Sequence, residues 1–207
     1  MNYVDFMIDP RDENEALKMI EIAHRFGYRI IGIESSIANS ERIINVSKSY
    51  DILLVKRAVL KISTKEDFFK KIKTIDNNCI ISAIPGNTSI LRYLGHAKRV
   101  DLVRIPLNSN LKIDKHQKNI FKIAKKGGIE ICLSELIELD ARPFLLRRFK
   151  NLVETSLKLD LKLLIASCAK NRYELWHPRQ VISLLETMGF DKRLAIKTIA
   201  TYIMPQT

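Results

Sequence analysis

Seven short apolar runs alternate with amphipathic segments along most of the chain, and this alternation restricts the fold more than any other feature. The runs are joined to the amphipathic segments by mostly short links. Such an alternation predicts βαβ units and a parallel sheet. The expected strands are residues 3–7, 29–35, 51–62, 78–84, 100–105, 129–133 and 162–166.

Helices are expected between the strands and after the last one. The first has Asp9 as its N-cap and Pro10 in its first turn, where proline needs no N–H partner, and it ends at Gly27. The expected helices are residues 10–26, 40–49, 65–74, 88–98, 114–126, 144–160, 178–188 and 191–203.

Several of the strands read as near-continuous apolar runs, which is typical of a sheet covered on both faces or closed into a barrel. About seven parallel strands favour an incomplete or irregular TIM-like (β/α) barrel over a doubly wound sheet. A chain of 207 residues fits one domain, and no break in composition marks a second. We therefore expect a single α/β domain over residues 1–207.

Positive charge is the most informative part of the composition. The chain has 35 Lys and Arg against 23 Asp and Glu, a formal net charge of +12, and a sequence pI of about 9.7. A basic balance of this size favours a polyanionic partner, either nucleic acid or an anionic membrane surface. The alternative is a general lysine bias without a matching partner.

Neither a membrane span nor a targeting segment is recognisable in the sequence. No apolar run approaches the ~20 residues that cross a bilayer. The first residues, Met1-Asn-Tyr-Val-Asp5, lack the basic and apolar regions of a signal peptide. We therefore expect a soluble, cytoplasmic protein without a membrane partner.

The stretch Ser167–Phe190 joins a loop of charged and aromatic side chains to a well-marked helix. It follows the apolar run 161–166, which reads as a buried strand. The loop carries Lys170, Arg172, Glu174, Trp176 and His177. The helix begins at Pro178 and ends at Gly189. Charge gathered at the end of a buried strand is costly without a partner, so this loop is the first candidate for function.

The same stretch resembles a known protein family. Its strand ends in Ser-x-Ala, its loop reads Glu174-Leu-x-x-Pro-Arg179, and its helix is followed by Met188-Gly-Phe190. This pattern is similar to the C-terminal signature of the ribonuclease P protein component 3 family. Further segments resemble that family in the same order, namely residues 50–57, 99–106, 124–132 and 145–149.

Two positions depart from the family pattern. Trp176 stands where the family usually has an arginine. One contact expected from that arginine, either with RNA or within the protein, is therefore in question for this chain. The C-terminal Ser-x-x-Pro segment of the family is blurred into residues 200–205. Neither departure disturbs the order of the elements.

The resemblance implies both a fold and a role. The implied fold is a TIM-like barrel related to the polymerase and histidinol phosphatase (PHP) superfamily. The implied role is that of a protein subunit of ribonuclease P (RNase P), which removes the 5′ leader from precursor tRNA. Catalysis would belong to the RNA subunit with its Mg²⁺, so this chain is expected to supply no catalytic residue and to bind no cofactor.

The resemblance also implies a set of partners. These are the RNase P RNA, a small RRM-like protein subunit, other RNase P proteins and, indirectly, precursor tRNA. A two-plus-two heterotetramer with the RRM-like subunit is the expected assembly.

A stand-alone PHP-like metal-dependent phosphoesterase is the main alternative. PHP relatives use a His-x-His motif after the first strand, whereas this chain reads Asp5-Phe-Met-Ile-Asp9 there. The four histidines never stand at ligand spacing, and the three cysteines lack CxxC spacing. Asp5, Asp9 and Glu34 could converge at strand ends, but Asp9 is expected to cap a helix. We therefore expect no metal site.

Two further alternatives have less support in the sequence. A barrel lyase or aldolase would need a buried catalytic lysine at a strand end, for which Lys56 and Lys61 are weak candidates. A purely structural protein with incidental charge would have no RNA affinity at ordinary salt.

The residues expected to bind RNA are basic side chains on helices and at strand ends, because lysine and arginine match phosphate oxygens. A one-sided lysine stripe on helix 114–126 is typical of a phosphate-tracking face, although a solvated face has the same pattern. Tyr173 and Trp176 are candidates for stacking on unpaired bases, with a packed loop anchor as the alternative for Trp176. The expected RNA-binding set is Lys61, Arg92, Lys122, Lys125, Lys126, Arg147, Lys170, Arg172 and Arg179.

Overall fold

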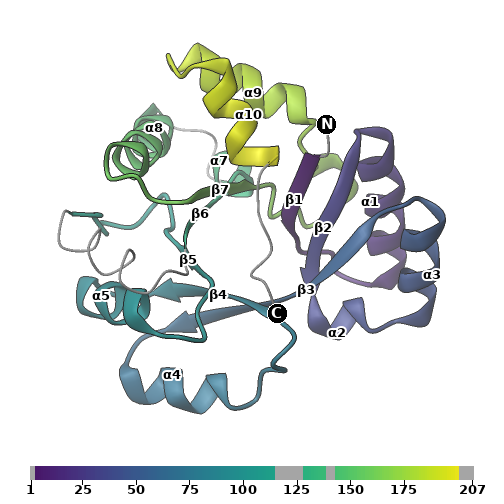
Figure 1. Cartoon of the computed structure of the whole chain (residues 1–207), viewed down its shortest axis with the longest axis horizontal. Coiled ribbons are helices and arrows are strands. Elements are labelled where there is room, and N and C mark those ends of the chain that lie inside the picture. Colours follow the sequence, from purple (N-terminus) through teal and green to yellow (C-terminus); the bar gives the residue numbers. More distant parts are fainter. Residues whose placement is uncertain (1–2, 115–127, 139–142, 201–207) are drawn as a thin grey trace. The chain divides into compact units, whose positions relative to one another are not determined.

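The computed structural model describes residues 3–114, 128–138 and 143–200 (Figure 1). The strands of this part are β1 (Tyr3–Ile8), β2 (Tyr28–Glu34), β3 (Leu53–Ile62), β4 (Ile80–Pro85), β5 (Leu102–Arg104), β6 (Gly128–Cys132) and β7 (Leu163–Ala166). Within the described residues these seven strands form one sheet in sequence order. The pairs β1–β2, β3–β4, β4–β5 and β5–β6 are parallel, as the strand–helix alternation predicts.

Helices connect the strands. They are α1 (Glu13–Arg25), α2 (Ser35–Ala38), α3 (Glu41–Ser49), α4 (Lys65–Ile72), α5 (Thr88–His96), α7 (Ser134–Glu138), α8 (Pro143–Lys158), the 3₁₀ helix η1 (Arg172–Glu174), α9 (Pro178–Thr187) and α10 (Lys192–Ala200). The short helices α2, α7 and η1 were not expected, because three to five residues are too few to show a helical period. Most of the helix expected at 114–126 lies outside the described residues. No described helix is long and apolar enough to cross a membrane.

Residue contacts divide the chain into two compact units. Unit 1 comprises Met1–Lys56 and Ile165–Thr207, and unit 2 comprises Arg57–Leu164. Both boundaries fall inside strands, since β3 and β7 each contribute residues to both units. The expectation of a single domain over residues 1–207 stays a prediction.

Unit 1 is built around β1, β2 and the inward face of α1. Ala16, Met19, Ile20 and Ala23 recur every three or four residues, so they lie on one side of α1 and are all buried. They share one apolar core with residues of β1 and β2 and with Ala169 and Leu175 of the chain after β7. A parallel bridge joins Ile8 to Ala169. The chain after β7 is therefore fixed against the carboxyl end of β1.

Unit 2 is built around β4, β5 and β6 together with most of β3. The register of β3 and β4 runs without interruption from Arg57 opposite Ile80 to Ile62 opposite Pro85. Gly86 follows β4, and its N–H donates to the Ile62 carbonyl at 2.8 Å. A Cβ atom on Gly86 would lie 3.2 Å from that oxygen, so the close approach favours glycine.

The first helix begins later than the sequence analysis expected. Its N-cap is Asp12, whose Oδ1 accepts from the Glu15 N–H at 2.8 Å. Asp9 is exposed, and its N–H donates to the Ala169 carbonyl at 2.7 Å. The expectation that Asp9 caps the helix is therefore wrong. Asp9 comes directly after the β-bridge between Ile8 and Ala169, and its backbone hydrogen bond continues that pairing.

The helix expected at Pro178 is confirmed. Pro178 is its first residue, and His177 is its N-cap. The His177 ring accepts from the Arg179 N–H at 3.1 Å, and the Gln180 side chain accepts from the His177 N–H at 2.8 Å. This reciprocal pair satisfies backbone donors that a helix start leaves open. Gly189 follows the helix with φ of +92°, a conformation that glycine adopts without strain.

Candidate nucleic-acid interface

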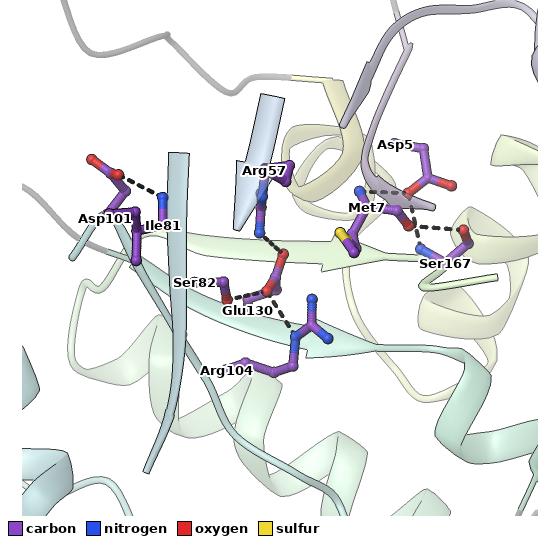
Figure 2. A network of polar contacts seen from close by, with 9 residues as sticks. All are labelled: Asp5, Met7, Arg57, Ile81, Ser82, Asp101, Arg104, Glu130 and Ser167. Atoms are coloured by element: carbon purple, nitrogen blue, oxygen red, sulfur yellow. Dashed lines mark hydrogen bonds and ion pairs between the residues drawn. The ribbon is translucent and has the colours of Figure 1, made fainter. Parts of the chain in front are cut away.

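The loop after β7 starts from a buried carboxylate. Asp5 Oδ1 accepts from the N–H of Ser167 at 3.0 Å and from the N–H of Met7 at 3.3 Å (Figure 2). The Cys168 N–H donates to the Met7 carbonyl at 2.8 Å. These bonds hold the start of the loop to β1, so Asp5 has a structural task in unit 1.

Further carboxylates hold the middle of the loop. The Lys170 N–H donates to Glu174 at 2.8 Å, and the Asn171 side-chain amide donates to the same carboxylate. The Arg172 N–H donates to Glu15 of α1 at 2.7 Å. Carboxylate acceptors bound to backbone N–H groups are among the stronger hydrogen bonds in proteins. These hydrogen bonds therefore fix the backbone of the loop at residues 170 and 172.

Arg172 and Tyr173 form a stacked pair at the tip of this loop. The guanidinium carbon lies 4.8 Å from the centroid of the tyrosine ring, and Nη2 donates to the tyrosine hydroxyl at 2.8 Å. Tyr173 is 81% exposed. The hydrogen bond to Tyr173 raises the pKa of Arg172, so the charge persists at every physiological pH. The pair presents a cation and an aromatic ring to solvent on a fixed backbone.

Trp176 is placed as a loop anchor rather than as an exposed ring. It is half-buried, and its indole Nε1 is covered by protein. Its carbonyl accepts from the Tyr28 hydroxyl at 2.8 Å. Burial, followed by the charges of Asp5 and Tyr3, raises the pKa of Tyr28 well above its ordinary value, so the hydroxyl stays a donor. This placement matches the alternative that the sequence left open for Trp176.

The other two expected basic residues of unit 1, Lys170 and Arg179, lie close in sequence to the Arg172–Tyr173 pair. Lys170 is exposed beside the loop, and Arg179 is exposed in the first turn of α9. We call residues 170–179 the 170–179 stretch. It carries three of the expected basic residues and Tyr173 within ten residues of unit 1, with Lys170, Tyr173 and Arg179 exposed and Arg172 partly exposed.

The expected basic residues of unit 2 lie on separate elements. Lys61 is exposed at the carboxyl end of β3, and Arg147 is exposed on α8. Arg92 of α5 lies 3.3 Å from Asp114, with both side chains about half exposed. An ion pair this exposed contributes little to stability. Lys122, Lys125 and Lys126 lie outside the described residues.

A buried ionic cluster in unit 2 was missed by the sequence analysis. Glu130 accepts from Arg57 at 2.7 Å through Oε1, and from Arg104 at 2.9 Å and Ser82 at 2.5 Å through Oε2 (Figure 2). We call these four residues the Glu130 cluster. They come from β3, β4, β5 and β6, one from each strand. A charged residue inside an apolar run could have pointed to a buried charge, as in Val55-Lys-Arg-Ala-Val59 and Ile129-Glu-Ile131.

The Glu130 cluster joins four strands by ionic hydrogen bonds and does not have the properties of a catalytic acid or base. Burial by itself raises the pKa of Glu130, but the Arg104 and Arg57 guanidinium groups and the Ser82 hydroxyl outweigh it and lower the pKa from 4.5 to about 2. The carboxylate is therefore ionised at neutral pH, with both oxygens accepting hydrogen bonds. Such a group is poorly suited to general acid–base catalysis, which works best with a pKa near the working pH.

The described residues contain no group of three or more His, Cys, Asp and Glu side chains that could hold a metal ion. Asp5 is hydrogen-bonded to the loop, while Asp9 and Glu34 are exposed. The carboxylates considered in the sequence analysis therefore form no such group. Lys61, the strand-end lysine considered for a lyase or aldolase, is exposed to solvent rather than buried.

Known proteins resemble the chain over nearly its full length. A model of the family described as RNase P subunit p30 matches residues 2–204. The chain belongs to this family. A ribonuclease P protein component 3 from Methanothermobacter thermautotrophicus is 21% identical over 215 residues, which covers 97% of this chain and 86% of the relative. One from Aeropyrum pernix is 22% identical over 190 residues, covering 91% and 89%.

Solved structures share the fold of this p30 family member. A chain in the cryo-EM structure of archaeal ribonuclease P with mature tRNA matches with a TM-score of 0.78 at 20% identity, covering 94% of this chain and 86% of that chain. A chain from the crystal structures of YwqE from Bacillus subtilis and CpsB from Streptococcus pneumoniae, metal-dependent tyrosine phosphatases, matches with a TM-score of 0.57 at 12% identity, covering 96% of both. Together with the parallel strand order, these likenesses confirm the expected α/β fold of the PHP-like, TIM-like barrel class.

Proposed function

We propose that this p30 family member is a protein subunit of RNase P and acts in the removal of the 5′ leader from precursor tRNA. The observation that carries the proposal is the family match over residues 2–204. The related component 3 proteins and the fold shared with a chain of archaeal RNase P bound to mature tRNA support it. The subunit is part of a holoenzyme that cleaves RNA.

The chain contributes binding rather than bond cleavage. Catalysis is assigned to the RNA subunit and to the Mg²⁺ that this RNA needs, with no cofactor held by the protein. The ionised state of Glu130 and its hydrogen bonds with Arg57, Arg104 and Ser82 support this division, because this fully buried carboxylate already has a structural role.

The proposed mechanism is electrostatic. Basic side chains neutralise phosphates of the catalytic RNA, which populates its active fold and lowers its demand for magnesium. The 170–179 stretch supports this mechanism in unit 1, because it carries Lys170, Arg172 and Arg179 together with an exposed tyrosine, and hydrogen bonds hold the backbone of residues 170 and 172. The other proposed contacts are Lys61, Arg92, Arg147, Lys122, Lys125 and Lys126.

The proposed assembly has several partners. RNase P RNA is the main one, and a small RRM-like subunit binds this chain in a two-plus-two heterotetramer. Other RNase P proteins complete the particle, which meets precursor tRNA in the cytoplasm. The family's relation to RNase P supports this set.

Precursor-tRNA cleavage by the cognate catalytic RNA at low magnesium tests the proposed function. The reaction contains the other protein subunits, with this chain either included or left out. We expect cleavage to depend on this chain, and the dependence to weaken as magnesium is raised. Cleavage that is indifferent to the chain at every magnesium concentration overturns the proposal, and turnover of a phosphomonoester with added metal would then favour the phosphoesterase alternative.

A further inference from the structure

In unit 2, α4 and α5 follow β3 and β4 (Figure 1), and three aromatic rings on these two helices contact one another. The ring centroids of Phe68 and Tyr93 lie 5.5 Å apart, those of Phe68 and Phe69 5.7 Å, and those of Phe69 and Tyr93 6.4 Å, all near edge-to-face. Phe68 is buried and anchors the cluster, whereas Phe69 is 55% exposed. We call these three rings the Phe69 platform. The other two rings hold Phe69 in place, so that part of its ring is presented to solvent on a fixed support.

Lysines bracket the Phe69 platform. The Lys65 ammonium lies 5.3 Å from the centroid of the Tyr93 ring. Lys65 and Lys73 stand four residues before and after Phe69, and the backbone of Lys73 keeps helical φ and ψ of −69° and −25°. Residues four apart on a helix lie on one face, so both lysines flank the exposed ring. Lys65, Lys70 and Lys73 are all exposed.

The carboxylates of α4 are engaged by other groups. Asp67 accepts from the Ser63 N–H at 3.1 Å and lies 3.0 Å from the Lys71 ammonium. Hydrogen bonds from its own backbone N–H and from the Thr64 side chain lower the pKa of Glu66, which stands in the first helical turn. Anions are stabilised at that end of a helix. The face around Phe69 therefore carries three exposed lysines and one ionised carboxylate, Glu66, whose charge adds to burial in raising the pKa of Tyr93.

We propose that the Phe69 platform and the flanking Lys65, Lys70 and Lys73 bind unpaired nucleotides of an RNA. This rests on the proposed function and adds a contact apart from the 170–179 stretch. An unpaired strand offers base faces for Phe69 and phosphates for the ammonium groups. Duplex RNA hides its base faces, and an apolar protein surface would leave the lysines unmatched, so single-stranded RNA fits both halves of the site.

Substitution of Phe69 separates stacking from simple apolar burial. The probe is a fluorescein-labelled oligouridylate of about ten nucleotides, within the usual site size of a single-strand groove, and binding to the full chain is followed by anisotropy. Phe69→Leu keeps apolar volume but removes the aromatic face, and Phe69→Trp keeps that face. We expect Phe69→Leu to weaken binding about tenfold and Phe69→Trp to bind like the wild type, because stacking requires a flat ring.

A charge-matched pair of variants tests the lysines. Lys65→Gln/Lys73→Gln removes two charges beside Phe69, and Lys18→Gln/Lys48→Gln removes two exposed charges from α1 and α3 of unit 1. We expect the first double variant to lower the magnitude of the log–log salt slope by about 1.4 for a single strand, and the second to leave it unchanged. Equal slopes for the two variants contradict a local phosphate contact.

The outcomes distinguish this inference from the proposed function. An unchanged affinity of Phe69→Leu for oligouridylate overturns the proposed binding site. So does a loss of affinity for an RNA duplex of the same length that equals its loss for oligouridylate. If Phe69→Leu instead abolishes assembly with the other RNase P proteins while RNA affinity stays constant, the surface binds protein and the inference is wrong. In both cases the wild-type chain can still stimulate precursor-tRNA cleavage, and only its failure to do so overturns the proposed function.

Discussion

At the scale of single residues, Glu130 illustrates how a buried charge is tolerated. Its carboxylate and the Arg57 guanidinium are fully buried, a combination that is costly unless geometry and hydrogen bonds compensate. The two guanidinium groups and the Ser82 hydroxyl provide that compensation. Removing one partner therefore lowers stability more than replacing the whole pair with apolar residues, because it leaves an unpaired charge in a low-dielectric interior.

We expect Glu130→Gln to lower the free energy of unfolding by about 3–5 kcal/mol, the usual cost of breaking a buried pair, as measured by urea denaturation. Because the folded-state pKa of Glu130 is lowered to about 2, its stabilisation is present above its ordinary pKa of 4.5 and is lost as the pH falls toward 2. The wild type should therefore lose its advantage over Glu130→Gln in that window. The control is Glu154→Gln on α8, whose partly exposed carboxylate lies 3.9 Å from Lys150 and should cost less than about 1 kcal/mol.

The exposure of Tyr173 leads to a second prediction at the scale of a single residue. Its ring is 81% exposed, so Tyr173→Ala should leave the unfolding free energy nearly unchanged. Affinity for the catalytic RNA should fall by ~1–3 kcal/mol if the ring stacks on a base. Tyr173→Phe keeps the ring and loses the hydrogen bond from Arg172, so it should bind nearly as well. Equal affinity of the alanine variant and the wild type in a filter-binding titration would rule out stacking at this position.

At the scale of elements, the start of α1 is decided by which aspartate can reach an open N–H group. Asp12 accepts from the Glu15 N–H, whereas Asp9 is held by the Ala169 carbonyl through its own backbone. Asp12→Ala should therefore cost about 0.5–2 kcal/mol of stability, the range for lost N-caps. Asp9→Ala should stay within about 0.5 kcal/mol, as for ordinary surface changes. Thermal denaturation of the two variants compares them directly, and a larger loss in Asp9→Ala would contradict the observed cap.

The type of each helix and strand followed from the hydrophobic pattern of the sequence, whereas the residue at which it starts or ends depended on local hydrogen bonds. Pro178 and Gly189 marked α9 correctly, because a missing N–H and a positive φ act within a few residues. The short helices α2, α7 and η1 left no periodic signal. The Glu130 cluster joins residues up to 73 positions apart, so its members could be suspected singly but not paired from sequence.

At the scale of the whole molecule, the chain groups into two compact units while β3 and β7 run through both. A strand shared by two units ties the ordering of one to the ordering of the other. We expect one cooperative unfolding transition, with the calorimetric enthalpy equal to the van't Hoff enthalpy in differential scanning calorimetry. Two resolved transitions, or a van't Hoff enthalpy well below the calorimetric one, would contradict the single domain expected from the sequence.

The sequence by itself determined the strand–helix order, the α/β class and the basic character of this p30 family member. These properties depend on residue type and on spacing along the chain, which are local and need no folded contact. Only the tertiary structure decided that Trp176 anchors its loop while Tyr173 stands exposed, because burial depends on residues such as Tyr28 that lie 148 positions away. The same holds for the Phe69 platform, in which a helix facing a second helix brings Tyr93 beside two phenylalanines.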